Sequence, residues 1–149
     1  MDQRIETALS LIACSYEGFL ATIEGEKPFV SAVSYLYEVN PGDPTKPGKV
    51  CLLLSELARH TRNFQKNPNV SLFILENNSA PVYERKRVTI QGTIHYVKDE
   101  ERYKNFKIKY LQIFPSAEPL FTFQDFRFFE INIADLHLIG GFGKVDTFR

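Results

Sequence analysis

Short apolar runs, each followed closely by a turn or a short polar segment, are the feature that most limits how this chain can fold. The runs at residues 18–24, 49–55, 69–76 and 87–97 are rich in β-branched and aromatic side chains, as strands are. We count about seven such runs, mostly joined in short hairpin fashion, with three helical segments. This order predicts a mainly β fold, a β-barrel of antiparallel strands with appended helices, and disfavours a parallel sheet.

Several local signals refine this prediction. The segment ELARHTRNFQKNP is expected to be a short helix that ends at Asn67, because a residue before proline disfavours the helical region. Residues 99–114 predict a longer amphipathic helix. Gly92 inside a strand indicates a bulge or a close approach by another group. Residues 121–133 and 135–145 predict two further strands, the second with a glycine break.

Length and composition exclude several classes of protein. The 149 residues fit one domain, spanning 1–149. The formal net charge is zero, which argues against a general nucleic-acid binder. No stretch approaches the length of uncharged apolar sequence that a membrane span needs. With only two cysteines and no ligand-like cluster, we expect a reduced, cytoplasmic setting and no metal site.

Cationic side chains follow directly after one buried strand, in the segment SELARHTRNFQK at residues 55–66. Arg59 offers a planar fork of donors suited to a phosphate, His60 and Arg62 add further donors, and Ser55 lies at the junction. Free backbone N–H groups at a helix start also favour anions. Two interpretations stay open here: an anion-binding site, or a solvated helix face with a serine cap.

Four motifs in this order resemble the pyridoxamine-5'-phosphate-oxidase-like FMN-binding split-barrel proteins, nearest the branch that includes haem-degrading oxygenases. They are PFVSAVSYLYE, the SELARHTRN segment, RVTIQGTIHYV and the closing DLHLIGGFG. The resemblance covers residues 18–143. It implies a split barrel that forms a homodimer, with two FMN sites at the subunit interface.

The resemblance also implies roles for particular residues in the cationic segment. Arg59 and His60 would hold the FMN phosphate. Ser55 would reach the ribityl chain or the flavin ring, and Arg62 or Asn63 would support them. A structural role in the helix is the alternative for each.

Three other motifs carry further candidates. Ser31, Val33 and Ser34 would lie along the isoalloxazine, although an ordinary barrel strand would present them equally well. Arg87 would reach across the dimer, or serve as an exposed strand-end arginine. Gly141 and Phe142, in the sequence IGGFG, would lie near the partner's flavin, or form a strand-end bulge.

Three functions remain after these comparisons of motifs. The first is a flavin-dependent oxidoreductase acting on an unknown small molecule, with no catalytic residue assigned. The second is a haem-binding or haem-degrading protein on the same barrel, and the third is a non-enzymatic flavin-binding protein. The absence of tryptophan and of a C-terminal Arg-x-His segment argues against pyridoxamine phosphate oxidation. The haem-degrading members carry a further C-terminal domain, whereas this sequence stops at Arg149, so we expect haem degradation to be the weaker alternative.

Overall fold

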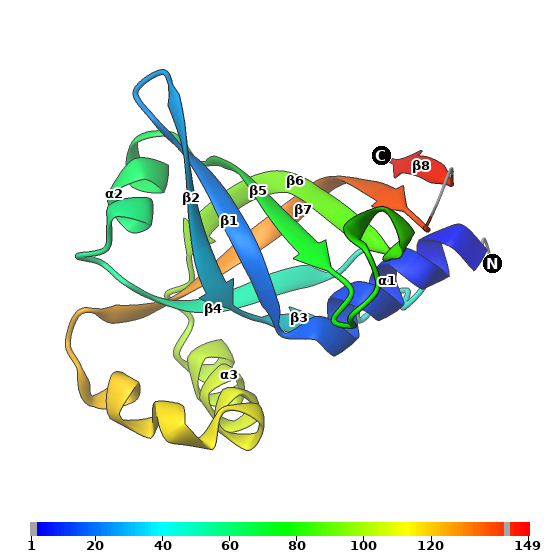
Figure 1. The fold of residues 1–149 in the computed structure, drawn as a ribbon. Coiled ribbons are helices and arrows are strands. Elements are labelled where there is room, and N and C mark those ends of the chain that lie inside the picture. The colour runs from blue at the N-terminus through cyan, green and yellow to red at the C-terminus, as the bar shows by residue number, and fades with distance from the viewer. Residues whose placement is uncertain (1–2, 142–143) are drawn as a thin grey trace.

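In the part of the chain that the structure describes, eight strands form one curled antiparallel sheet, with helices at its ends and below it (Figure 1). The computed structural model describes residues 3–141 and 144–149. The elements in chain order are α1 (Gln3–Ser15), β1 (Glu17–Glu24), β2 (Lys27–Ser34), β3 (Leu36–Glu38), β4 (Lys49–Ser55), α2 (Arg59–Lys66), β5 (Asn69–Leu75), η1 (Val82–Glu84), β6 (Arg87–Tyr96), α3 (Glu100–Ile113), η2 (Pro115–Thr122), β7 (Phe126–Ile139) and β8 (Val145–Phe148).

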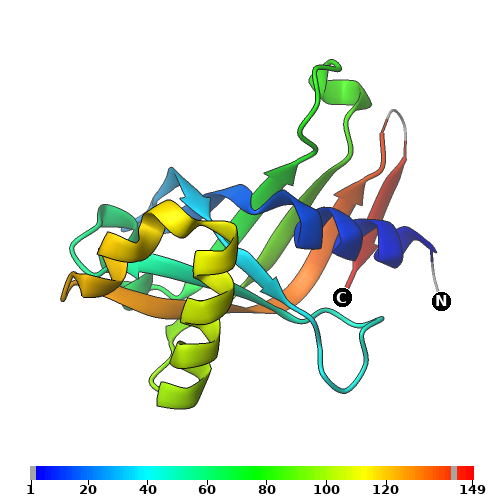
Figure 2. The ribbon, with the colours of Figure 1, turned by 90° about the horizontal axis from the view of Figure 1, so that it is seen from below.

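The order of the strands forces the sheet to curl into a barrel. The order is β2-β1-β5-β6-β7-β4-β3, with β8 beside β7. The edge strands β2 and β3 are separated in the chain by Tyr35 alone, so the two edges must meet there. Tyr35 is fully buried, and its hydroxyl donates to the Ile12 carbonyl oxygen of α1 at 2.6 Å. The predicted split barrel is therefore confirmed, and α1 closes one of its ends (Figure 2).

Two groups of buried side chains stabilise this arrangement. The larger fills the barrel and is supplied by alternate positions of the strands, such as Leu20, Leu72 and Ile90, which are fully buried. The smaller lies on the outer side of β4 and β7, beneath α3 and η2. In it the rings of Phe106 and Phe128 stack with centroids 4.2 Å apart. The strands β4 and β7 are thus covered on both faces.

Gly92 lies opposite a bulge in β7 and approaches that strand closely. The pairing of β6 with β7 shifts between Gln91 and Gly92. A Cβ atom on Gly92 would lie 2.0 Å from the Asn132 carbonyl oxygen, so a larger residue cannot fit without moving β7. The prediction of a bulge or close approach is confirmed.

The C-terminal third differs from the prediction in two places. Residues 121–125 are not strand, because Phe121 packs against the rings of Phe106 and Tyr110 and extends η2 instead. The two predicted final strands are one continuous strand, β7, since the bulge opposite Gly92 absorbs Ala134 without ending the pairing with β6. In the part of the chain that the structure describes, no helix is long and apolar enough to cross a membrane.

Candidate functional site

The turn from β4 into α2 is built around Ser55. Its hydroxyl donates to Asp125 Oδ2 at 2.6 Å and accepts from the Leu57 backbone N–H at 3.1 Å. The Thr61 hydroxyl donates to the Ser55 carbonyl oxygen at 2.6 Å. The helix then ends at Asn67, as predicted. Ser55 therefore holds the turn in this structure, and its hydroxyl is already engaged with a carboxylate.

The Arg59 guanidinium is paired with Glu24, at the end of β1. Arg59 Nε donates to Glu24 Oε2 and Arg59 Nη2 to Glu24 Oε1, each at 2.6 Å. The guanidinium also lies 4.4 Å from the centroid of the Phe29 ring. The hydrogen bonds from Arg59 hold the pKa of the Glu24 carboxyl below its usual range. Both side chains remain exposed to solvent, and a ligand phosphate that bound the same edge of Arg59 would have to displace Glu24.

His60 has one engaged and one unengaged ring nitrogen. Nδ1 lies 3.0 Å from Ser31 Oγ, and the ring is nearly parallel to that of Phe64. Nε2 is buried, with no hydrogen-bond partner among the described residues. Burial lowers the pKa of the imidazole, which favours its neutral form. A buried polar atom without a partner is costly, so Nε2 is the atom here that most needs an explanation.

The two remaining candidates on α2 point in different directions. The Asn63 amide is buried, 3.0 Å from Thr22 Oγ1 and 3.3 Å from Glu24 Oε2. It therefore helps to fix the carboxylate that Arg59 binds. Arg62 is exposed, and its side chain forms no hydrogen bond or ion pair with the residues that the structure describes.

The candidates on β2 divide between the core and a surface cavity. The Val33 side chain is buried inside the barrel. Val33 and Ser34 also contribute to the wall of a cavity of about 370 Å³, which Phe19 and Arg85 line from neighbouring segments. Ser31 is the β2 candidate that contacts α2, through His60.

Arg87 and Gly141 lie together at the other end of the sheet. Arg87 Nη1 donates to the carbonyl oxygens of Val82 and Arg85, at 2.8 and 2.9 Å, and so holds the η1 loop. Gly141 has φ +115°, and a Cβ atom there would lie 3.4 Å from the Glu84 carbonyl oxygen. Phe142 lies outside the described residues.

The predicted residues thus form two separate groups within one chain. The α2 segment is adjacent to the start of β5, whereas Arg87 pairs with Leu75 at the end of β5. A strand of this length spans roughly 20 Å. Figure 1 shows α2 and β8 at opposite ends of the sheet. One chain alone does not gather the predicted set into one site.

A buried ionic cluster centred on Glu130 of β7 was not predicted from the sequence. Glu130 is only 2% exposed, and it accepts from Arg102 Nη2 at 2.6 Å and Lys49 Nζ at 3.2 Å, with His95 Nε2 at 2.9 Å. Arg102 also donates to Glu38. Burial alone would raise the pKa of Glu130, but the hydrogen bonds from Arg102 and Lys49 hold it below its usual range.

The amphipathic pattern of residues 99–114 predicted the helix, but not that Arg102 on this helix pairs with a buried glutamate. A glutamate inside the aromatic run FRFFEINI was the signal that could have indicated a buried ion pair.

Residues 1–148 match the sequence profile of the CREG beta-barrel family. The chain belongs to the CREG β-barrel family. The barrel has the split-barrel fold that the motifs predicted. A comparison with curated protein sequences found no match.

Solved structures share the fold of this CREG barrel at low sequence identity. A haem-binding protein from Mycobacterium smegmatis has a TM-score of 0.83 and 24% identity, over 99% of this chain and 58% of that one. HutZ, the haem storage protein of Vibrio cholerae, has a TM-score of 0.75 and 24% identity, over 93% and 97%. A candidate pyridoxamine 5'-phosphate oxidase from Listeria innocua has a TM-score of 0.69 and 14% identity, over 92% and 98%. These identities establish the fold alone, and the chain spans little more than half of the Mycobacterium protein.

Proposed function

We propose that this CREG barrel is an FMN-binding protein and a flavin-dependent oxidoreductase, with the FMN phosphate held where α2 begins. The observation that carries the proposal is the buried Nε2 of His60, which lacks a partner and lies one residue from Arg59. A phosphate oxygen is a fitting partner for both side chains, because a guanidinium fork matches phosphate geometry and an imidazole N–H can donate beside it. The motif resemblance supports the same two residues.

The ion pair between Arg59 and Glu24 is compatible with this proposal. Both side chains are exposed to solvent, and exposed ion pairs contribute little stability. A phosphate carries nearly two negative charges at neutral pH and three acceptor oxygens. It can therefore replace the Glu24 carboxylate on Arg59, and Glu24 would then turn to solvent.

The chemistry of the proposed function belongs to the cofactor. When bound, FMN accepts a hydride or electrons from a donor and passes them to a substrate. The residues of this chain would bind and orient it: Arg59 and His60 at the phosphate, and Ser31 through its contact with His60. Ser34, beside the cavity on β2, is where we expect the ring.

A homodimer is part of the same proposal. The outer face of β2, β1 and β5 forms the front wall in Figure 1, and the helices that the structure describes lie at its ends. Apolar side chains are exposed on this wall, with Val30 59% and Phe19 47% exposed. A second copy packed here would cover them. A two-fold axis would also bring Arg87 and Gly141 of one chain toward α2 of the other.

The first test is the absorption spectrum of the purified protein after addition of FMN and desalting. We expect a retained two-band flavin spectrum at about one FMN per chain. The variant Arg59→Ala/His60→Ala should lose FMN, while Lys66→Ala, which removes a charge at the far end of α2, should retain it. Circular dichroism checks that both variants fold. Wild-type FMN affinity in the double variant would refute the phosphate assignment.

Haem is the second candidate ligand, because two of the similar structures are a haem-binding and a haem storage protein. Titration with haemin should then give a shifted Soret band that saturates at a fixed ratio of haem to chain. If FMN binds but NADH and NADPH both leave it oxidised, a flavin-binding protein without this activity becomes the better description.

A further inference from the structure

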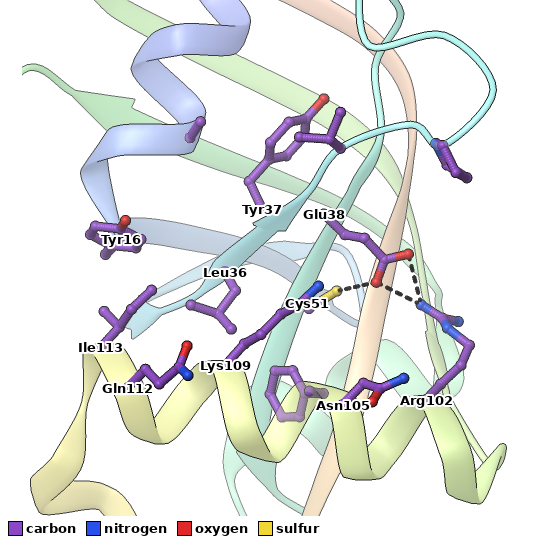
Figure 3. Close-up of a pocket in the computed structure, with 14 residues that line it drawn as sticks. Tyr16, Leu36, Tyr37, Glu38, Cys51, Arg102, Asn105, Lys109, Gln112 and Ile113 are labelled. Atoms are coloured by element: carbon purple, nitrogen blue, oxygen red, sulfur yellow. Dashed lines mark hydrogen bonds and ion pairs between the residues drawn. The ribbon is translucent and has the colours of Figure 1, made fainter.

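A cavity of about 500 Å³ lies between α1, β3, β4 and α3 (Figure 3). This volume is within the usual range for small-molecule pockets. Its polar and charged lining comes mainly from one face of α3, where Arg102, Asn105, Lys109 and Gln112 recur at helical spacing. Leu36 and Ile113 give it an apolar wall.

The charged end of the cavity is formed by Arg102 and Glu38 (Figure 3). Arg102 is fixed there by Glu130 and Glu38, and every hydrogen bond that its guanidinium makes to the described residues leaves from Nη2. Nε and Nη1 therefore remain available to a ligand. A guanidinium held in place from one edge is well suited to bind an anion at the other.

The charges around the cavity leave an excess of one cation. Glu38 and Glu130 pair with Arg102 and Lys49, and Lys109 is a third cation, in the lining of the cavity. Lys49 and Arg102 neutralise Glu130 and Glu38, whereas Lys109 is exposed and forms no ion pair with the described residues. Lys109 lines the same cavity as Arg102, two helical turns further along α3. A ligand with one negative charge would balance the set.

The lining offers binding groups but no nucleophile. Burial raises the pKa of the Cys51 thiol to about 12, so the thiol stays protonated at neutral pH. It contacts Glu38 Oε2 at 3.9 Å. Burial likewise raises the pKa of the Tyr37 hydroxyl. Neither group would react as an anion at neutral pH.

We infer that this cavity binds an amphipathic organic monocarboxylate, with its carboxylate between Arg102 and Lys109 and its apolar body against Leu36 and Ile113. The site is separate from the proposed FMN site, and it needs no residue of α2 or β2. It gives the CREG barrel a second ligand, of a different chemical class from the flavin.

Titration calorimetry with octanoate and with octylammonium, which share one apolar chain, tests this inference. Octanoate should bind once per chain and octylammonium should not. Lys109→Gln should weaken octanoate binding about tenfold, the worth of one charge-assisted hydrogen bond. Lys104→Gln removes an exposed charge from the same helix outside the cavity and should leave the affinity unchanged. Ile113→Glu, at the apolar end, should abolish binding.

Three results would overturn the inference. They are no octanoate binding in the millimolar range, equal binding of the two amphiphiles, or equal octanoate affinity in Lys109→Gln and Lys104→Gln. Both lysines are exposed, so their replacement leaves the fold intact and each result can be interpreted.

Discussion

Arg59 and Glu24 face each other through two parallel hydrogen bonds of 2.6 Å, so the side chain best suited to a phosphate holds a carboxylate of its own chain. The carboxylate offers the same two-oxygen edge that a phosphate would. Asn63, buried below, keeps it in place. Glu24 is thus expected to compete directly with an incoming anion.

Removal of this competitor should strengthen FMN binding. Glu24→Gln abolishes the negative charge but keeps the shape of the side chain, and we expect a several-fold gain in FMN affinity, measured by quenching of flavin fluorescence. Glu26→Gln, in the hairpin turn that follows Glu24 and without an ion pair to any described residue, is the matched control and should behave as wild type. Equal affinities in the two variants would show that Arg59 does not meet the phosphate.

The buried imidazole of His60 should make stability depend on pH. Burial lowers its pKa in the folded protein below the ordinary 6.5, so the unfolded chain binds the proton more readily. The stability that comes from the lowered pKa of His60 is fully present above about pH 6.5 and declines as the pH falls below that value. We expect urea unfolding of the FMN-free protein to show a loss of stability between about pH 7.5 and about pH 5.5. The loss should be smaller in His60→Gln; an equal loss would contradict the prediction.

The exposed apolar face of β2, β1 and β5 is the proposed dimer interface, so a charge placed on it should change the oligomeric state. Val30→Asp or Phe19→Asp places a charge in the centre of the proposed interface, and we expect the dimer to become monomeric in sedimentation velocity. Ile108→Asp is the control, because Ile108 on α3 is also 59% exposed but lies away from this wall. A monomeric wild-type protein, or a variant that stays dimeric, would refute the interface.

The ionic cluster of Glu130 should stabilise the fold strongly. Arg102→Met leaves a carboxylate that is 2% exposed without its shortest hydrogen bond, and we expect a loss of about 3 kcal/mol in the free energy of unfolding. This loss is at the lower end of the usual range for a broken buried ion pair, because Lys49 and His95 still contact Glu130. Lys104→Met should change stability by less than about 0.5 kcal/mol.

A second substitution separates charge from packing at this site. In Arg102→Met/Glu130→Leu both charges are gone, and most of the lost stability should return, since apolar replacements of buried pairs are often neutral. If the double variant stays as unstable as Arg102→Met, packing of the arginine stem explains the loss.

Local sequence signals predicted most of the fold but less of the site. Alternating apolar runs predicted the strands, and Asn67 before a proline predicted the end of α2. Gly92 indicated the bulge. Each of these depends on neighbouring residues. The strand predicted at residues 121–125 is wrong because Phe121 packs against aromatic side chains of α3. No local sequence pattern contains this contact.

The pairings that define the candidate sites are all distant in sequence. Arg59 meets a glutamate 35 positions away, and Lys49 meets Glu130 81 positions away. Which side chains face each other across strands depends on register, and a shift of one residue reverses every face. The motifs could therefore indicate Arg59 and His60 as candidates, but not that one is bound to Glu24 while the other has a free nitrogen.

The junction of β2 and β3 at Tyr35 also determines how the barrel is closed. The two edge strands are joined there by a single residue, and no ladder of hydrogen bonds links β2 to β3 among the described strands. A circularly permuted chain with its new termini at this residue would keep every strand pair. Such a chain would be an open ribbon, held closed by its apolar interior, by α1 and by the contacts of α2 with β1 and β2. The barrel therefore has a seam, and a bound ligand or a second subunit could widen it without breaking the sheet.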